Sequence, residues 1–73
     1  MRVTQQHGDW KLDIETVPVD GMFTAKAMIS RKRTDGLPGS IGYTFKNVGE
    51  KGSPQEVAEW AAGWLRGWID DNA

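Results

Sequence analysis

His7 is the only histidine among the 73 residues, and the chain has no cysteine. Nucleophilic catalysis requires a nucleophile that is activated by a neighbouring base. With no cysteine and no second histidine, no such pair can be built around His7, which we expect to be a surface side chain in a flexible segment, residues 1–8. The absence of cysteine also excludes disulfides and cysteine-ligated metals.

Two pairs of carboxylates could do acid–base or metal chemistry. Asp13 and Glu15 alternate along a predicted strand, which places them about 7 Å apart on one face, a distance at which paired carboxylates can act. We expect that face to be a solvated surface without a cleft. Asp70 and Asp71 at a helix C-terminus oppose the helix dipole and lack a third metal ligand. We therefore expect no enzyme, no metal site and no cofactor.

Basic residues raise the possibility of nucleic-acid binding. A three-stranded sheet with a basic face can enter the major groove of DNA. The net charge is only −1, however, and residues 1–52 carry eight Lys/Arg against six Asp/Glu, which is weak for a dedicated nucleic-acid binder. The candidate contacts are Lys26, Arg31, Lys32, Arg33 and Lys46.

Period-two alternation of apolar and polar residues recurs three times along the chain. Trp10, Leu12 and Ile14 alternate with charged residues, and two later stretches repeat the pattern. Between the first two of these stretches, Asp20-Gly21 supplies a residue that can adopt a positive φ, as a reversal of the chain requires. Short connections favour an antiparallel meander. The expected strands are residues 9–17, 22–33 and 40–48.

One amphipathic helix follows the strands. Ser53 suits an N-cap, Pro54 the first helical position, and Glu56 stands three residues after Ser53 as a capping box requires. From Val57 to Ile69 apolar residues recur at helical spacing on one face. The pattern predicts a helix over 54–70.

Three tryptophans, Trp60, Trp64 and Trp68, lie on that helix. A small chain needs large buried anchors, so we expect Trp64 and Trp68 to press against the apolar face of the sheet, and truncation of Trp64 to unfold the chain. Trp60 lies at the edge of the stripe beside Gly63 and Gly67. Each of these glycines weakens a helix by about 1 kcal/mol relative to alanine. They could make room for an indole or loop of the same chain, allow close approach of a second chain, or serve no purpose.

A protein-binding surface is the remaining possibility. The third predicted strand carries only Lys46 as a charge, so its edge is open to dimerisation or to a guest strand. Methionines on the outer sheet face would add an adaptable apolar patch. The candidate interaction residues are Trp60, Gly63, Gly67, Met22 and Met28.

The order of three strands and one helix resembles two DNA-binding domains, that of plant ethylene-response factors and the arm-binding domain of tyrosine integrases. The resemblance is one of topology; the arginines and the tryptophan with which those sheets read DNA have no counterparts here. Gly8-Asp9-Trp10 and Trp68-Ile69-Asp70 also resemble the opening and the ending of small bacterial proteins of unknown function. That second resemblance implies a β-β-β-α fold and no activity.

These patterns predict a single α+β domain, residues 1–73, with a three-stranded antiparallel sheet covered on one face by a C-terminal helix. No apolar run follows the N-terminal arginine and no segment is long enough to span a membrane, so we expect a cytoplasmic protein. The expected function is a small non-enzymatic module that binds an unknown protein partner or its own copy. The alternative is DNA binding through the basic sheet face.

Overall fold

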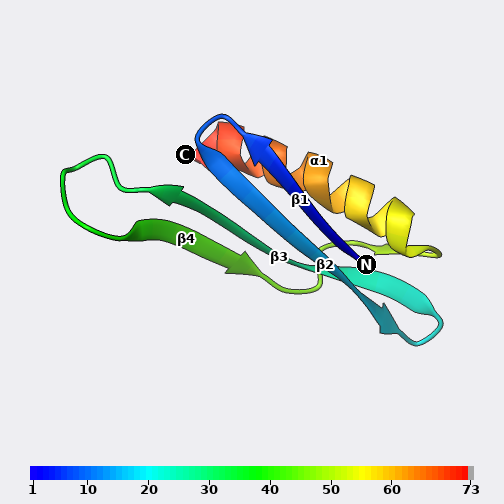
Figure 1. Cartoon of the computed structure of the whole chain (residues 1–73). Coiled ribbons are helices and arrows are strands. Elements are labelled where there is room, and N and C mark those ends of the chain that lie inside the picture. The colour runs from blue at the N-terminus through cyan, green and yellow to red at the C-terminus, as the bar shows by residue number, and fades with distance from the viewer. Residues whose placement is uncertain (73) are drawn as a thin grey trace.

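A computed structural model describes residues 1–72 and shows an α+β fold in which one helix covers one face of an antiparallel sheet (Figure 1). The strands run β1-β2-β3-β4 across the sheet, each beside its neighbour in the chain, and β5 also pairs with β3. The elements are β1 (Arg2–His7), β2 (Trp10–Val19), β3 (Met22–Lys32), β4 (Ser40–Phe45), β5 (Glu50–Lys51) and α1 (Pro54–Asn72).

Strand β1 was not predicted, since residues 1–8 were expected to be flexible. It pairs with β2 along its whole length, from Arg2 opposite Glu15 to His7 opposite Trp10. Gly8 has a φ of 61° at the first central position of the two-residue turn, where glycine is typical of hairpins. The segment escapes prediction because its six residues are almost all polar and show no alternation.

The expected third strand, residues 40–48, is interrupted in the structure. β4 pairs with the C-terminal half of β3 and β5 with its start, so both lie along the same side of that strand. Between them Asn47 and Gly49 adopt positive φ values of 57° and 78°. Val48 donates its N–H to the carbonyl of Ala25 at 2.8 Å and buries its side chain, which anchors the interruption to the sheet.

The start of the helix agrees with its capping signal. Ser53 Oγ accepts the backbone N–H of Glu56 at 3.2 Å, and the Ser53 carbonyl accepts the N–H of Val57 at 3.2 Å. At the other end α1 continues two residues beyond the predicted boundary, to Asn72. Asn72 Nδ2 donates to the carbonyl of Trp68 at 2.9 Å and so satisfies one of the last free carbonyls of the helix.

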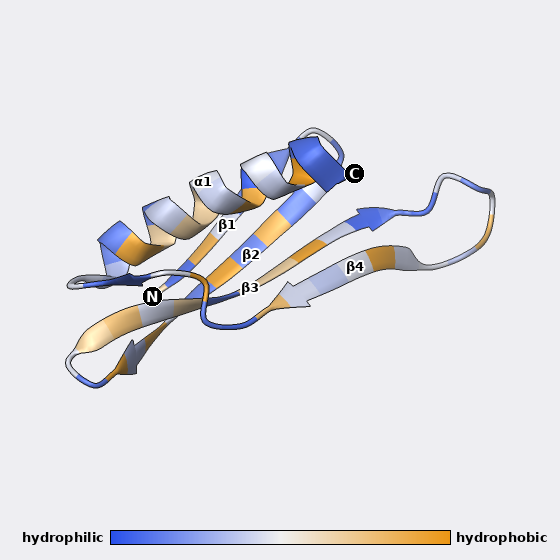
Figure 2. Ribbon diagram, turned by 180° about the vertical axis from the view of Figure 1, so that it is seen from behind, coloured by the Kyte–Doolittle hydropathy of each residue, from blue (hydrophilic) through white to orange (hydrophobic). Residues whose placement is uncertain are grey.

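The core lies between α1 and the sheet face on which the alternating apolar residues of β2 and β3 stand. Leu12, Ile14 and Ile29 are fully buried, and Leu65 and Val57 meet them from the helix. Figure 2 shows the helix lying over this layer while β4 and the β3–β4 loop extend to one side of it. The other buried apolar residues are Trp10, Ala25, Ala27, Val48, Ala58, Ala61, Ala62 and Ile69.

The expectation that Trp64 belongs to the core is wrong, and that for Trp68 holds only in part. Trp64 is 40% exposed, while Trp68 is partly buried and packs against the margin of the core. The reason is the unpredicted strand β1. A sheet that is one strand wider shifts the buried stripe of α1 toward Ala58 and Ala62, and the tryptophans are left on the flank that faces β4.

Candidate interaction surface

An aromatic cluster fills the angle between α1 and β4. We call the set Trp60, Trp64, Trp68, Tyr43 and Phe45 the aromatic flank. Phe45 meets the indoles of Trp64 and Trp68 edge to face, with centroids 5.3 and 5.2 Å apart, and Tyr43 lies 5.2 Å from Trp68. Such pairs add about 0.5–1.5 kcal/mol each beyond burial. The contacts hold β4 beneath the helix edge.

Much of the aromatic flank remains accessible to solvent. Tyr43 is 46% exposed, Trp60 42% and Trp64 40%. Isolated apolar side chains on a surface are ordinary, but large adjoining ones mark binding sites. Three exposed aromatic side chains thus gather on one side of a 73-residue chain.

Trp60 is held in place from below by the turn that separates β4 from β5. Gly49 takes a φ of 78°, and a Cβ at this glycine would lie 2.5 Å from the Trp60 ring. The indole therefore rests directly on peptide backbone. Beside it, a groove of about 390 Å³ is lined by the residues from Thr44 to Gly49 together with Trp60 and Trp64.

A second hollow, of about 290 Å³, follows on the helix. It is lined by Gly63 and Gly67 beside Trp64 and Trp68, with the end of the helix. A Cβ at Gly67 would meet nothing within 4 Å, and one at Gly63 would meet only Arg66 Nη2 at 3.7 Å. Hence no indole or loop of the described chain requires these glycines, and the first of their three explanations is wrong.

The free edge of β4 borders the aromatic flank. Within residues 1–72, β4 has a strand on one side only, that of β3. Its six residues, SIGYTF, contain neither a charge nor a proline, which are the devices that usually protect an edge strand from pairing. Lys46 follows directly after it. The opposite edge strand, β1, begins with Arg2 and is otherwise polar except for Val3.

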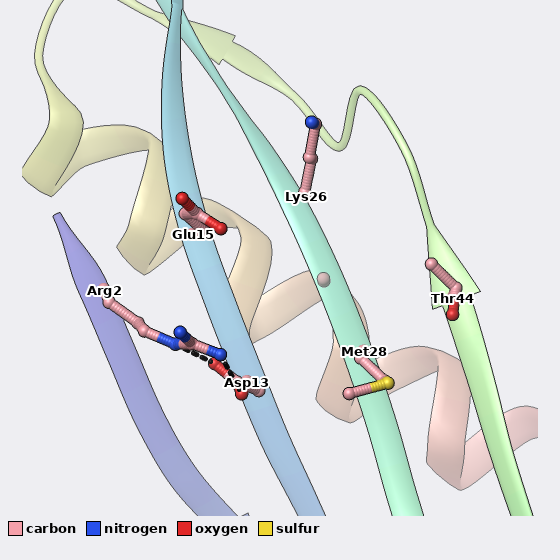
Figure 3. Close-up of a pocket in the computed structure, with 7 residues that line it drawn as sticks. Arg2, Asp13, Glu15, Lys26, Met28 and Thr44 are labelled. Atoms are coloured by element: carbon pink, nitrogen blue, oxygen red, sulfur yellow. Dashed lines mark hydrogen bonds and ion pairs between the residues drawn. The ribbon is translucent and has the colours of Figure 1, made fainter.

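The outer face of the sheet carries mixed charge (Figure 3). Arg2 donates to both carboxylate oxygens of Asp13, at 2.9 and 2.8 Å, and this hydrogen bonding lowers the pKa of Asp13. Glu15 stands opposite Lys26 in the register of β2 and β3. A shallow, open hollow of about 220 Å³ lies among these residues. Each carboxylate of the predicted pair thus has its own basic neighbour, Arg2 beside Asp13 and Lys26 opposite Glu15.

The basic residues considered for nucleic acid are spread over several surfaces. Lys26 and Lys32 are exposed on β3, whereas Arg31 lies in register with Ile41 on the helix side of the sheet, its guanidinium 5.2 Å from the centroid of the Trp10 ring. Arg33 forms a two-point ion pair with Asp35, whose pKa it lowers. Lys46 is exposed after β4.

The predicted interaction residues also divide between two faces. Trp60, Gly63 and Gly67 are exposed on the flank of α1, as that prediction requires. Met28 is 48% exposed on the outer sheet face, where it lines the shallow hollow. Met22 is partly buried at the start of β3. Tyr43 and Phe45 of β4 lie beside tryptophans of the helix, a position that depends on the placement of α1 and that the alternation of the strand does not predict.

His7 has a structural partner. Its Nε2 lies 2.9 Å from Asp70 Oδ1, which connects β1 to the last turn of α1, and Arg66 Nη1 donates to Gln5 at 2.9 Å on the same side. The described residues contain no group of three or more histidine, aspartate or glutamate side chains placed to hold a metal ion. No helix in this part of the chain combines the length and the apolar character that crossing a membrane requires.

Comparison with protein-family models, with curated proteins and with solved structures finds no match to this chain.

Proposed function

We propose that this chain is a small, non-enzymatic protein-interaction module that binds an extended polypeptide segment along β4 and the aromatic flank. The proposal rests on two features that lie side by side on the surface of the molecule. An unpaired strand edge without charge lies directly beside three exposed aromatic side chains. Addition of a strand to such an edge is a common mode of peptide recognition, with backbone hydrogen bonds for affinity and side-chain pockets for specificity.

The surface favours a partner of a particular chemistry. Side chains of an added strand alternate between the two faces of the sheet, so every second one would lie over Tyr43 and Trp64 and the others over the polar outer face. Covering the exposed part of each tryptophan removes roughly 80 Å² from water, worth about 2 kcal/mol per side chain. The expected partner is therefore an uncharged extended segment with apolar side chains at every second position.

The test uses a defined probe, an end-capped seven-residue peptide in which phenylalanine and serine alternate. Its control has the same composition with the phenylalanines adjacent to one another. Tryptophan fluorescence at submicromolar chain concentration reports binding, and amide NMR shifts locate it. We expect saturable binding of the alternating peptide, with shifts in Ser40–Phe45 and in the indole N–H groups of Trp60 and Trp64.

Trp64→Ala serves as the matched variant, because its indole contributes to the surface but not to the fully buried core. It should weaken peptide binding at least tenfold and keep the dispersed spectrum of a folded chain. Shifts confined to β1 would contradict the proposal, as would equal binding of both peptides.

A further inference from the structure

We infer that the partner segment ends at this surface. Its C-terminal carboxylate binds at the turn that follows β4, residues 46–49, and its last side chain, which is apolar, enters the groove beside Trp60. The inference rests on the proposed function, since it names the end of the partner and its direction along β4. Capture of a C-terminal carboxylate by backbone N–H groups is a recurring mode of peptide recognition.

The charge of the groove is of one sign. Lys46 is its only charged lining residue, and no acidic residue of the described chain lines it. Within residues 1–72 the basic side chains that contact a carboxylate are those of Arg2, His7 and Arg33. The exposed ammonium group of Lys46 therefore has no counter-ion in this part of the chain. A carboxylate beside it would gain a charge-assisted hydrogen bond.

The backbone of the turn carries donors that the described chain does not use. Positive φ values of 57° at Asn47 and 78° at Gly49 alternate with negative φ at Lys46 and Val48. Such alternation is typical of backbone concavities that bind anions. The N–H of Val48 donates to Ala25, whereas those of Asn47 and Gly49 have no acceptor within residues 1–72. A carboxylate has two oxygens that can accept them.

The groove lies across the free edge of β4. Its lining includes both Thr44 and Phe45. Because adjacent side chains of a strand point to opposite faces of the sheet, the groove cannot belong to one face alone. β3 occupies the other side of β4, so the groove opens beside the edge at which an added strand would pair. A segment whose last residue reaches the turn after β4 runs in the same direction as β4, and the added strand is parallel.

The carboxylate is that of the chain end and not of an acidic side chain. A terminal residue carries its carboxylate and its side chain on one Cα, so the two groups reach the turn and the indoles of Trp60 and Trp64 together. Those indoles are 42% and 40% exposed. An aspartate or glutamate would bring a charge to them in place of an apolar group and would forfeit the burial of their exposed area. The side chains of the partner thus remain uncharged, as the proposed function requires.

The test compares three forms of the alternating phenylalanine–serine peptide, all acetylated at the N-terminus. The first is the end-capped peptide, the second has a free C-terminal carboxylate, and the third is end-capped with glutamate as its last residue. Tryptophan fluorescence gives the three dissociation constants. We expect the free acid to bind about tenfold more tightly than the end-capped peptide, in keeping with one hydrogen bond to a charged group. The glutamate peptide should bind no more tightly than the end-capped one.

Lys46→Gln and Lys26→Gln form a matched pair of variants. Each removes the charge of an exposed lysine, and Lys26 lies at the hollow of the outer sheet face. Lys46→Gln should bring the dissociation constant of the free acid close to that of the end-capped peptide. Lys26→Gln should preserve the difference between the two peptides.

Amide NMR locates the end of the peptide and gives its direction. The N–H signals of Asn47 and Gly49 should shift more with the free acid than with the end-capped peptide. A spin label at the peptide N-terminus should broaden Ile41 more than Phe45, because a parallel strand begins beside the start of β4.

The outcomes separate the inference from the proposed function. Equal binding of the free acid and the end-capped peptide overturns the inference alone, as does a preference for the free acid that Lys46→Gln leaves unchanged. Tighter binding of the glutamate peptide than of the end-capped one assigns the carboxylate to a side chain and overturns it too. Broadening of Phe45 in place of Ile41 contradicts the parallel direction. If none of the three peptides binds, the inference and the proposed function are both wrong.

Discussion

The two exposed glycines of α1 give the sharpest test of the helix flank. Gly63 and Gly67 lie inside a helix that runs from Pro54 to Asn72, where glycine is less favourable than alanine by about 1 kcal/mol. A methyl group at Gly67 would meet open space, and one at Gly63 would touch only the end of a flexible arginine. Each substitution to alanine should therefore stabilise the chain by nearly the full propensity difference.

The magnitude is measurable in a chain of this size. A change of 1 kcal/mol shifts the Tm of a 60–100-residue domain by about 4–8 °C. The double variant Gly63→Ala/Gly67→Ala should gain roughly 2 kcal/mol, the sum of the two propensity differences. Urea titration followed by circular dichroism, at a chain concentration low enough to keep the protein monomeric, gives the free energy of unfolding directly.

Gly49→Ala is the control that separates helix propensity from a general effect of alanine. Its φ of 78° and the Trp60 ring 2.5 Å from the new Cβ require destabilisation. If Gly67→Ala instead lowered the free energy of unfolding in the dilute monomer, that flank of α1 would have to be packed within the chain. The position assigned to the tryptophans would then be refuted.

Further substitutions test the core, the helix cap and an ion pair. Leu65→Ala should cost about 2–5 kcal/mol, near the whole stability of a domain this small, whereas Trp64→Ala should leave a cooperative melting curve because much of its indole is already in water. Ser53→Ala should lower the free energy of unfolding by about 1 kcal/mol in urea titration through loss of the cap. Arg2 lowers the pKa of Asp13, so this pair stabilises the fold above the unfolded-state pKa of about 3.9 and loses its effect as pH falls through the lower folded value. Asp13→Asn should therefore reduce the fall of Tm at low pH. An unchanged fall of Tm in this variant would contradict the role given to the Arg2–Asp13 pair.

Local signals in the sequence predict the parts of this fold that depend on local chemistry. Ser53 and Pro54 place the helix start, and the structure shows the cap. Alternation in β2 and β3 predicts which side chains face the helix, and the register confirms it. Asp20-Gly21 predicts the reversal between them, where both residues take positive φ. In each case a few adjacent residues determine the outcome.

The features that the sequence could not predict depend on distant partners. β1 is polar, and its pairing with β2 stabilises it more than any preference of its own residues does. That strand in turn decides which stripe of α1 is buried, so the error at Trp64 follows from the omission of β1. The interruption at Asn47–Gly49 places Gly49 beneath Trp60 of the helix, a contact between distant segments that no local pattern records.

The order of elements along the chain has a consequence for biosynthesis. β2 and β3 are joined by a two-residue turn, and hairpins of this kind form in about 1–10 μs. A ribosome adds about 5–20 residues per second, so the cover provided by α1 arrives seconds later. During that interval no helix is present to bury Leu12, Ile14 and Ile29. The last element to be synthesised is thus the one that closes the core, so the free energy of burying these side chains is gained only once α1 has been made.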